Sequence, residues 1–538
     1  MVICGRLSKI IEDISMYLRQ LDISGFRGIK RLSIMLRANM VLIGENSWGK
    51  SSLLSALSLI LNAENGLYHF TEADFHRSED MKSITLLFTF SEGNVNEEHD
   101  QFDAPVQRLF VPHEDGYKRI YLRVTGELNS QNEVITQYSF LDQLGHCIKL
   151  DNIEDIVQKM IQYHPIYRFR DARLNHHKAN SQPLKYAECA DQTIKEIYAV
   201  MELVKYYFVE EQPSQTIMSM DPGKLWYMAQ SLCYRLEQDA DHSLQKRLID
   251  TIFPLFEYHQ KPNEKIIHSE RIRPILLLED LATRLHPRMV AIVWKLTSYL
   301  PIQRITTTNS VDLISLVELK SICKLVRYAD RTIAYQLKRH DLGKEDLRRL
   351  TFHIHHNRSL ALFARTWILV EGETEVWILS ELAKLLGIDL DIEGIRIVEF
   401  AQSGIRPLIK YAKAMGIEWY ALTDGDEAGR KYTETVKDML SEDESVSQRV
   451  MTLPKQDIEH FFYTQGFEEV FIRLSHWQPQ GEHYPMHKII QRAIQRTSKP
   501  DLAIAISNEI EKRGKESIPF LFKRLFSKVV NLTKTQES

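Results

Sequence analysis

Apolar and polar positions alternate in two runs near the start of the chain, over YLRQLDIS and IKRLSIML. This period of two predicts a pair of half-buried strands joined near residues 25–28. An apolar run at residues 40–43 comes next, followed by GENSWGKSS and the apolar periodicity of SLLSALSLIL. That order predicts a strand, a glycine loop and a helix. Three more strands, SITLLFTF, RIYLRVTGEL and EVITQYSFL, are predicted between residues 81 and 145.

The pattern changes at residue 151, where a helical periodicity rich in Leu, Met, Tyr and Glu begins and continues to about residue 256. With few helix breakers, this block predicts a helical insertion. At residue 274 a buried strand, ILLLED, is predicted. It is followed by a helix from about Arg288 and by a second strand, QRITTT, which leads to Asn309.

From Thr366 the predicted strands and helices alternate strictly. The strands are TWILVEG, RIVEF, EWYALTDGD and RVMTLP, and each intervening segment has helical periodicity. Such alternation predicts a parallel sheet covered by helices on both faces, with right-handed crossovers. The segment after residue 476 is predicted to be mostly helical. The fold class that follows is α/β.

Composition and charge narrow the classes of protein. The chain has 538 residues, of which 44% are hydrophobic and 26% charged, which favours several packed domains over a small module or a disordered chain. With 68 Lys and Arg against 72 Asp and Glu, the net charge of −4 excludes a global positive field. Only residues 486–538 are locally basic, which fits either a DNA-binding face or a solvated helical face.

The five cysteines are scattered and form no CxxC pair, which argues against a disulfide framework and a cysteine zinc site. This usage fits a reducing cytosol, so a cytoplasmic location is expected. No apolar run reaches the roughly 18–20 residues that span a bilayer. Charged positions in the first fifteen residues interrupt the apolar core that a signal peptide needs. Because the first strand pattern directly follows Met16, we expect the natural start there.

Residues 44–51 spell GxxxxGKS between a predicted strand and a predicted helix. In this context glycines let the loop curl, so that backbone N–H groups and the helix N-terminus face the phosphates of a nucleotide. Lys50 would reach the β- and γ-phosphates of ATP, and the Ser51 hydroxyl would ligate Mg²⁺. The predicted nucleotide contacts in this segment are Gly44, Asn46, Gly49, Lys50, Ser51 and Ser52.

A P-loop enzyme also needs an acid at the end of a second buried strand, which holds Mg²⁺ and polarises the attacking water. ILLLED supplies Glu279 and Asp280 at that place. An acid at the end of a strand is commonplace by itself. Together with the P-loop and the strand that leads to Asn309, the pair predicts a Mg²⁺ ligand, Glu279, and a general base, Asp280. Asn309 is predicted to contact the nucleotide.

The FRG segment, the P-loop and ILLLEDLATRLHP resemble the ABC-type ATPase heads of DNA-repair and chromosome-maintenance proteins. The chain departs from that pattern in two ways. Asn309 stands where those heads usually have a histidine that senses the γ-phosphate. No LSGGQ-like signature precedes ILLLED, and residues 219–223 match it poorly. We therefore expect slow ATP turnover, with nucleotide acting as a conformational switch.

Carboxylates follow two of the predicted parallel strands, Glu371 in ILVEGETE and Asp424 and Asp426 in LTDGDEAG. Ligands gather at the carboxyl ends of such strands. Several carboxylates together require cations, and oxygen ligands favour Mg²⁺ or Mn²⁺. Two such ions about 3.5–4 Å apart would activate a water and stabilise the leaving oxygen of a phosphodiester. These segments resemble the Toprim domain of topoisomerases, primases and certain nucleases.

Each of these residues also has an ordinary structural interpretation. The DGD segment is compatible with a plain turn. Glu373 and Glu375 favour the dipole of the helix whose first turn they occupy. Glu459 is compatible with a capping or surface acid, Lys499 with a solvated lysine, and Ser403 with a helix cap. Their joint presence in one predicted domain favours a metal site.

An ATPase head and a Toprim domain in one chain of this length resemble the overcoming-lysogenization-defect (OLD) family of ATP-dependent endonucleases, in particular its YbjD-like branch. The resemblance implies that the helical insertion mediates formation of a homodimer or a higher homo-oligomer. The metal ligands that it implies are Glu371, Glu375, Asp424, Asp426 and Glu459. Ser403 and Lys499 would assist at the scissile phosphate. Over both sites, the predicted catalytic residues are Asp280, Glu371, Ser403 and Lys499.

The expected function is that of an ATP-dependent DNA endonuclease or nickase that uses Mg²⁺ or Mn²⁺, in DNA repair or phage defence. The alternative is a DNA-binding or phage-defence sensing ATPase whose Toprim domain is regulatory and does not cleave. Arg168, Arg170 and Arg173 could contact nucleotide or DNA. The predicted domains are an ATPase head at 16–150 and 266–355, a helical insertion at 151–265, a Toprim domain at 356–475 and a helical segment at 476–538.

Overall fold

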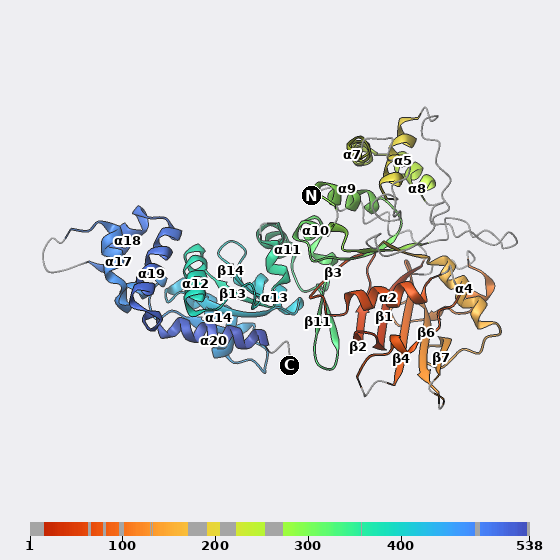
Figure 1. Ribbon diagram of the computed structural model, residues 1–538, viewed down its shortest axis with the longest axis horizontal. Coiled ribbons are helices and arrows are strands. Elements are labelled where there is room, and N and C mark those ends of the chain that lie inside the picture. The colour runs from red at the N-terminus through yellow and green to blue at the C-terminus, as the bar shows by residue number, and fades with distance from the viewer. Residues whose placement is uncertain are drawn as a thin grey trace. The chain divides into compact units, whose positions relative to one another are not determined.

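The computed structural model describes twelve stretches of the chain, and they group into two compact units that meet between Ala334 and Tyr335 (Figure 1). The described residues are 16–62, 66–78, 82–95, 102–129, 131, 133–169, 191–204, 222–252, 273–283, 285–356, 358–478 and 485–534. Several expectations lie outside them: the residues before Met16, parts of the helical insertion, Arg170, Arg173 and most of residues 219–223.

The first unit contains an antiparallel sheet with the strand order β2-β1-β4-β6-β5, to which β7 adds by pairing with β6. Alternation in β1 buries every second side chain over most of its length, with a register shift between Leu18 and Gln20. The strands are β1 (Met16–Phe26), β2 (Ile29–Met35), β4 (Ser83–Glu92), β5 (Val111–Pro112), β6 (Lys118–Leu128) and β7 (Val134–Leu141). The strand pair and the three further strands of the prediction are all present.

A second sheet in this unit has the order β12-β11-β3-β10-β9-β8, in which β8, β9, β10, β3 and β11 pair in parallel. Its central strands are buried along nearly their whole length, as expected of a parallel sheet covered on both faces. The strands are β3 (Asn39–Ile43), β8 (Ile166–Phe169), β9 (Ile275–Glu279), β10 (Gln303–Thr307), β11 (Ile322–Arg327) and β12 (Thr332–Gln336).

Strand β8 corrects the expectation of continuous helical structure after residue 151. A strand of four residues is too short to interrupt a helical periodicity visibly in the sequence. The hydrogen bonds that make β8 a strand come from β9, which lies more than a hundred positions later in the chain. The helices of this unit are α2 (Lys50–Ile60), α3 (Ala104–Gln107), α4 (Ile153–Tyr163), α5 (Gln192–Val204), α7 (Pro222–Gln238), α8 (Ser243–Ile252), α9 (Pro287–Ser298) and α10 (Val311–Leu316), with short 3₁₀ turns at Glu72–Asp74, Leu281–Thr283 and Leu319–Ser321.

The second unit is built on a four-stranded parallel sheet with the order β14-β13-β15-β16. Its strands are β13 (Thr366–Val370), β14 (Ile395–Glu399), β15 (Glu418–Thr423) and β16 (Val450–Thr452). Helices α12 (Glu373–Leu386) and α20 (Phe520–Lys534) contact each other, while α13 (Ile405–Ala414) and α14 (Glu427–Asp438) form another pair (Figure 1). The alternation predicted from residue 366 onward is confirmed, and the fold is α/β.

The remaining elements of this unit are helical, and those after residue 476 agree with the helical segment predicted there. They are α11 (Lys344–Leu350), a π-helix (Thr351–His356), a 3₁₀ helix (Ser359–Phe363), α15 (Val446–Arg449), α16 (Ile458–Phe462), a π-helical turn (Tyr463–Phe467), α17 (Glu468–Ser475), α18 (Met486–Arg496), α19 (Lys499–Arg513) and a 3₁₀ turn (Lys515–Ser517). No helix among the described residues is long and apolar enough to cross a membrane.

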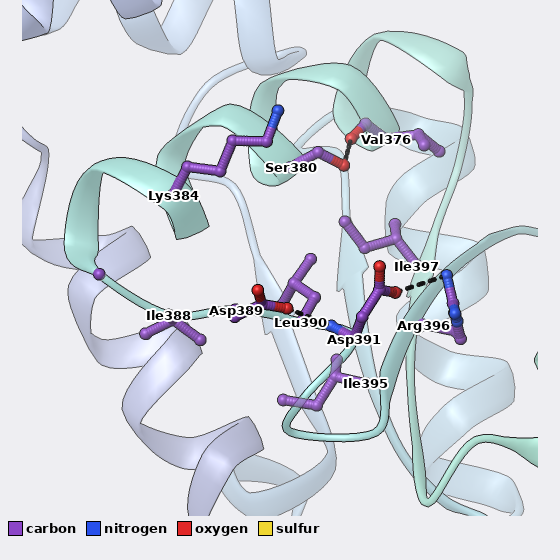
Figure 2. A pocket seen from close by; sticks show the side chains of 11 residues that line it. Val376, Ser380, Lys384, Ile388, Asp389, Leu390, Asp391, Ile395, Arg396 and Ile397 are labelled. Carbon is purple, nitrogen blue, oxygen red and sulfur yellow. Dashed lines mark hydrogen bonds and ion pairs between the residues drawn. The ribbon is translucent and has the colours of Figure 1, made fainter.

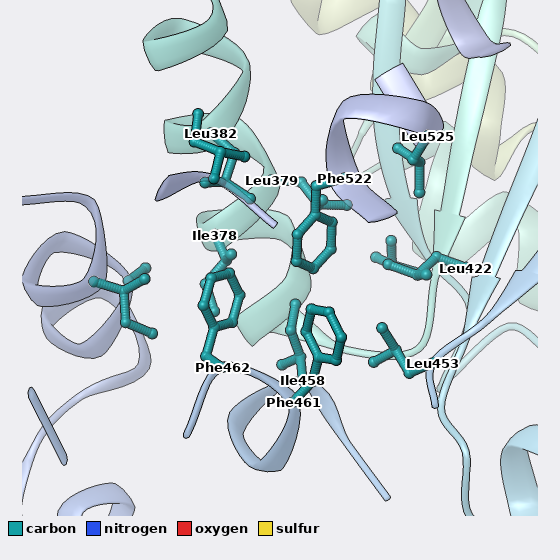
Figure 3. Close-up of a cluster of buried hydrophobic side chains, with 14 of the residues drawn as sticks. Ile378, Leu379, Leu382, Leu422, Leu453, Ile458, Phe461, Phe462, Phe522 and Leu525 are labelled. Atoms are coloured by element: carbon teal, nitrogen blue, oxygen red, sulfur yellow. The ribbon is translucent and has the colours of Figure 1, made fainter. Parts of the chain in front are cut away.

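Buried aromatic side chains join the sheet of the second unit to its helical end (Figure 3). The ring of Phe522 on α20 stacks on Phe462 at a centroid distance of 5.3 Å and meets Phe461 edge-on at 5.6 Å. Leu422 of β15 and Leu379 of α12 belong to the same cluster. Apolar burial thus fixes α16, which follows β16, against the first half of α12.

Replacing Phe522 with Ala should lower the free energy of unfolding by about 3–5 kcal/mol, because truncating a fully buried aromatic side chain leaves a cavity. Phe520 is the matched control, since it lies in the same first turn of α20 and is 77% exposed. Its replacement with Ala should change the free energy by less than about 0.5 kcal/mol. Urea unfolding followed by circular dichroism measures both, and equal losses would contradict this packing.

Candidate nucleotide and metal sites

The P-loop joins β3 to α2, and its glycines have backbone conformations that favour glycine. Gly44 has a φ of +141° and Gly49 one of +98°. A Cβ atom on Gly44 would also lie 2.7 Å from the carbonyl oxygen of Leu325 on β11. The loop therefore curls tightly around the start of α2, where the first backbone N–H groups of a helix lack internal partners. This geometry is suited to a phosphate.

The Lys50 side chain is buried, and its ammonium donates to the carbonyl of Gly44 and, over 3.1 Å, to Oδ1 of Asn309. Asn309 follows β10, the neighbour of β3, and its Nδ2 donates to Oδ1 of Asn46 over 2.8 Å. Asn309 therefore bridges the P-loop lysine and a P-loop asparagine. The structure brings together these three predicted nucleotide contacts.

The two serines that follow Lys50 differ in their surroundings. Ser51 is exposed at the start of α2. The hydroxyl of Ser52 accepts a hydrogen bond from the backbone N–H of Gly28 over 3.2 Å, which ties the P-loop helix to the FRG segment. Ser51 is thus the more accessible of the two hydroxyls, as a Mg²⁺ ligand must be.

Asp280 lies just beyond β9 in a left-handed backbone conformation, with a φ of +49°. Its backbone N–H donates to the carbonyl of Thr307 over 3.1 Å, which fixes it beside the end of β10. Burial raises the pKa of Asp280, the Lys50 ammonium opposes that rise, and Glu279 adds to it. Burial in turn lowers the pKa of Lys50, which Asp280 counteracts. Asp280 and the P-loop lysine therefore lie within electrostatic range of one another.

The Glu279 carboxylate is bound by a guanidinium that the sequence pattern did not assign. Arg168 on β8 donates to Oε2 of Glu279 from Nη2 over 2.9 Å and from Nε over 3.2 Å. Its Nη1 reaches the hydroxyls of Ser55 and Ser58 on α2, at 3.3 and 3.1 Å. As a Mg²⁺ ligand, Glu279 would have to share its carboxylate with Arg168.

In the second unit, two parallel strands bring the motif carboxylates to one edge of the sheet. Leu369 of β13 pairs with Ala421 of β15, so Glu371 and Asp424 follow neighbouring strands in nearly the same register. Glycines make the turn after β15 tight. A Cβ atom on Gly425 would lie 2.3 Å from the carbonyl oxygen of Lys455, and one on Gly429 would lie 2.0 Å from that of Asp424.

The charges at this edge act on one another. Burial, with Glu375 and Glu371 as the largest neighbouring charges, raises the pKa of Asp424 to about 8. Burial, with Asp426 and Glu375, raises the pKa of Glu371. Burial, Asp457 and Glu375 raise the pKa of Glu459 to about 7. The five predicted metal ligands therefore lie within electrostatic range of each other.

Asp457, which the sequence reasoning missed, belongs to this group because it also raises the pKa of Asp424 and Glu375. It is the N-cap of α16, and its Oδ1 accepts from the backbone N–H of His460 over 2.7 Å. The ring Nδ1 of His460 lies 2.6 Å from the same oxygen, and the ring of His487 stacks on that of His460. The available signal was its spacing, two residues before Glu459 at the end of β16.

Several of the predicted ligands also have structural roles. The backbone N–H of Gly372 donates to Oε2 of Glu375 over 3.1 Å, and that of Gly429 donates to Oδ1 of Asp426 over 2.7 Å. Glu371 differs, because its buried Oε2 has no hydrogen-bond partner in the described part of the chain. A buried carboxylate oxygen without a donor is where a cation is most needed.

Lys499 and Ser403 have different surroundings. Lys499 is the first residue of α19, which packs on α12, and its positive charge lowers the pKa of Glu375. The structure thus brings Lys499 to the carboxylates. Ser403 precedes the N-cap glycine of α13, and its buried hydroxyl has no hydrogen-bond partner among the described residues.

The donor set fits a hard divalent cation, since carboxylate oxygens are what Mg²⁺ and Mn²⁺ prefer. Among the described residues, however, no three His, Cys, Asp or Glu side chains form a ready group of metal ligands. The two observations are compatible, because electrostatic coupling extends over longer distances than ligation does. Like charges held this close repel one another, and a cation would offset that repulsion and draw the oxygens together.

A larger cavity of the second unit, about 630 Å³, contains none of these residues (Figure 2). It lies beside the later part of α12 and the start of β14, whereas the carboxylates lie at the start of α12 and the ends of the strands. Asp391 and Arg396 form an ion pair of 2.8 Å at its wall. The size of a cavity is therefore no guide to the chemistry of this unit.

Two family models match the chain. One is described as a protein of unknown function (DUF2813) and matches residues 16–361. The other is described as the overcoming lysogenization defect protein-like TOPRIM domain and matches residues 362–426. The second match spans three predicted ligands, Glu371, Glu375 and Asp424, and ends at a fourth, Asp426.

Among known proteins, the uncharacterized protein YbjD of Escherichia coli (strain K12) is 39% identical over 96% of this chain and 99% of its own length. Endonuclease GajA of Bacillus cereus (strain VD045) is 29% identical over 80 residues, which are 15% of this chain and 14% of its own.

Two solved structures resemble parts of the chain. The C-terminal region of the Burkholderia pseudomallei OLD protein is 16% identical, with a TM-score of 0.27, over 32% of this chain and 99% of its own. The SMC head domain from Thermotoga maritima is 11% identical, with a TM-score of 0.30, over 60% of this chain and 99% of its own.

Replacing Asp424 with Asn should stabilise the metal-free protein in alkaline solution. With its pKa raised to about 8, Asp424 holds a proton in the folded chain that the unfolded chain releases near pH 4, so stability falls as the pH rises from about 4 through 8. Asn abolishes that loss. We expect a gain of several kcal/mol near pH 9 and almost none near pH 4, since one pKa unit corresponds to about 1.4 kcal/mol.

Urea unfolding in EDTA at both pH values measures this effect. Asp443→Asn is the control, because Asp443 is an exposed carboxylate of the same unit. An equal gain in both variants, or a loss in Asp424→Asn at pH 9, would show that Asp424 is not held among like charges. Adding Mg²⁺ should reduce the difference in the free energy of unfolding between the wild type and Asp424→Asn.

Proposed function

This chain belongs to the DUF2813 family and carries an OLD-like Toprim domain, and from this premise we propose its function. We propose that it is a metal-dependent DNA endonuclease or nickase that is controlled by ATP at its P-loop. The relative named as an endonuclease, GajA, and the OLD-like domain support a nuclease class. The observation that carries the proposal is the group of mutually coupled carboxylates at the carboxyl edge of a parallel sheet.

At this edge, Glu371, Glu375, Asp424, Asp426 and Glu459 would hold Mg²⁺ or Mn²⁺. When bound, such ions activate a water and stabilise the leaving oxygen of a phosphodiester. The unpartnered oxygen of Glu371 is available to the metal. Lys499, whose charge acts on Glu375, would offset part of the negative charge of the phosphodiester and of the acids around it.

In the first unit, the P-loop and Lys50 would hold the phosphates of ATP, and Ser51 would ligate its Mg²⁺. Asp280 faces Lys50 and would act as the general base, as in other P-loop enzymes. Asn309 can donate a hydrogen bond to the γ-phosphate but cannot carry a charge. We infer slow hydrolysis, with nucleotide binding as the regulatory step. Self-association through the helical insertion stays a prediction.

A second function, a DNA-binding or phage-defence sensing ATPase with a non-cleaving Toprim domain, has one observation in its favour. In the described residues no three acids stand in ligating positions, and Asp426 and Glu375 accept backbone hydrogen bonds as ordinary capping residues do. The two functions predict different results in a cleavage assay and the same result in an ATP-binding assay.

The cleavage assay uses supercoiled plasmid with Mg²⁺ or Mn²⁺, with and without ATP. We expect the wild type to produce nicked or linear plasmid, and Glu371→Gln to lower the rate by at least about 100-fold, because it removes a metal ligand. Glu373→Gln is the matched control, because Glu373 is exposed and lies two residues after Glu371. We expect this variant to cut the plasmid at the wild-type rate. Gel electrophoresis over time measures all three.

An intact plasmid with wild-type protein under every metal and nucleotide condition would leave the non-cleaving ATPase as the better function. Equal cutting by wild type and Glu371→Gln would show that a different site, or a contaminant, cleaves. Metal removal with EDTA should abolish wild-type cutting and be reversed by excess Mg²⁺.

ATP turnover should be slow, below about one per second, the low end of enzyme rates. Lys50→Ala should abolish nucleotide binding, since Lys50 is the buried lysine of the P-loop. Asn309→His should accelerate hydrolysis, because a histidine can carry the charge that the amide lacks. A phosphate-release assay and fluorescent-ATP titration measure the two effects. Wild-type hydrolysis at many turnovers per second would overturn the view of ATP as a switch.

A further inference from the structure

A small pocket lies at the same edge of the parallel sheet as the carboxylates, one strand further along. It has a volume of about 100 Å³ and is lined by His353, Ile354, Arg358, Glu399, Gln402 and Ser403. Glu399 ends β14 and pairs with Val370, the residue before Glu371. Neighbouring strands are about 4.8 Å apart. The pocket is thus next to the carboxylate site but has different walls.

Ser403 points to a missing ligand. Its side chain is 1% exposed, and its hydroxyl has no hydrogen-bond partner in the described part of the chain. A buried hydroxyl that makes no hydrogen bond is unfavourable, and native proteins rarely tolerate one without a reason. Because Ser403 lines the pocket, a ligand there would supply the missing partner.

Arg358 supplies positive charge to the same pocket. Its Nη2 pairs with Oε1 of Glu399 over 2.7 Å, and its other guanidinium donors have no partner among the described residues. A guanidinium has five N–H donors in a planar fork that matches a phosphate. His353 lies on the π-helix just before Arg358, and π-helical turns often occur at functional sites.

We propose that this pocket binds a phosphate group next to the carboxylates, through Arg358, Ser403, His353 and Gln402. The volume of about 100 Å³ is several times the roughly 10–15 Å³ that one water needs, so the pocket has room for a tetrahedral phosphate. The placement of this phosphate beside a cleaved one rests on the proposed nuclease function. Because Glu399 pairs with Val370, the residue before Glu371, a phosphate in this pocket would be a neighbour of the scissile one.

Glu399 has two opposing effects on such a ligand. Its ion pair holds the Arg358 guanidinium at the wall of the pocket. Its negative charge also repels an entering phosphate and competes for the Arg358 donors. The pocket is therefore close to neutral, and removing the Glu399 charge should make it more attractive to an anion. Removing the Glu399 charge should therefore strengthen anion binding if the pocket is a ligand site, and weaken it if the ion pair is only structural.

The test measures binding of a fluorescent DNA duplex to the full chain by anisotropy, in Mg²⁺ and in a Glu371→Gln background that the proposed function makes inactive. Arg358→Gln and Ser403→Ala should weaken binding three- to tenfold. Glu399→Gln should tighten it three- to tenfold, which misfolding cannot imitate. Arg358→Gln should also reduce the dependence of log Kd on log salt by about 0.9, the effect of one phosphate contact.

Arg348→Gln is the matched control, since it removes the same charge from an exposed ion pair of this unit and should change Kd less than twofold. Inorganic phosphate and a deoxynucleoside monophosphate are the competing arms. Displacement of DNA by either at millimolar concentration, lost in Arg358→Gln, would assign the pocket to a free phosphate product. No displacement, with the variant effects intact, would assign it to the DNA backbone.

Wild-type affinity in Arg358→Gln, Ser403→Ala and Glu399→Gln alike would overturn the proposal. So would weaker binding in Glu399→Gln, because the ion pair would then be structural. These outcomes are independent of the plasmid assay. If the plasmid stays intact while the three variants shift DNA affinity as expected, the nuclease function fails and the phosphate pocket stands.

Discussion

Mutual repulsion among carboxylates at one edge of a parallel sheet is the constraint on which the second unit depends. Parallel strands β13 and β15 end side by side, so Glu371 and Asp424 cannot separate without breaking the sheet. Helix α16, fixed by the Phe461, Phe462 and Phe522 cluster, adds Glu459 to them. Apolar packing thus offsets the cost of gathering like charges. Burial first, and the neighbouring carboxylates second, raise the pKa values of Glu371, Asp424 and Glu459.

The nucleotide site resolves a similar conflict with residues of opposite sign. Glu279 forms an ion pair with Arg168, and the positive charge of Lys50 opposes the rise that burial causes in the pKa of Asp280. A buried acid that is paired in the way of Glu279 needs no ion to be tolerated. In the carboxylate group, by contrast, the largest charges that act on the pKa values of Glu371, Glu375, Asp424 and Glu459 are mostly other carboxylates, and Lys499 opposes them at Glu375. The two sites therefore differ in how far they depend on an external cation.

Local patterns predicted most of the fold and many of the site positions, because strand alternation, helical periodicity and the P-loop are encoded within a few residues. The positions they missed depend on distant pairing. Strand β8 is a strand only because β9 lies beside it, so the role of Arg168 could not be inferred from its neighbours in sequence. Asp457 is an ordinary N-cap by local criteria, and only its proximity to Asp424 and Glu459 gives it a second significance.

Ser403 has surroundings in the fold that its sequence context did not indicate. By sequence, it precedes a helix and fits either a cap or a residue near the scissile phosphate. In the fold, Gly404 is the N-cap of α13, and the Ser403 hydroxyl makes no capping hydrogen bond and is buried beside Arg358 and Glu399. A cap would have satisfied that hydroxyl within the chain. Because the hydroxyl is buried and has no hydrogen-bond partner among the residues that the structure describes, its partner is best sought in a ligand, and the guanidinium beside it favours an anionic one.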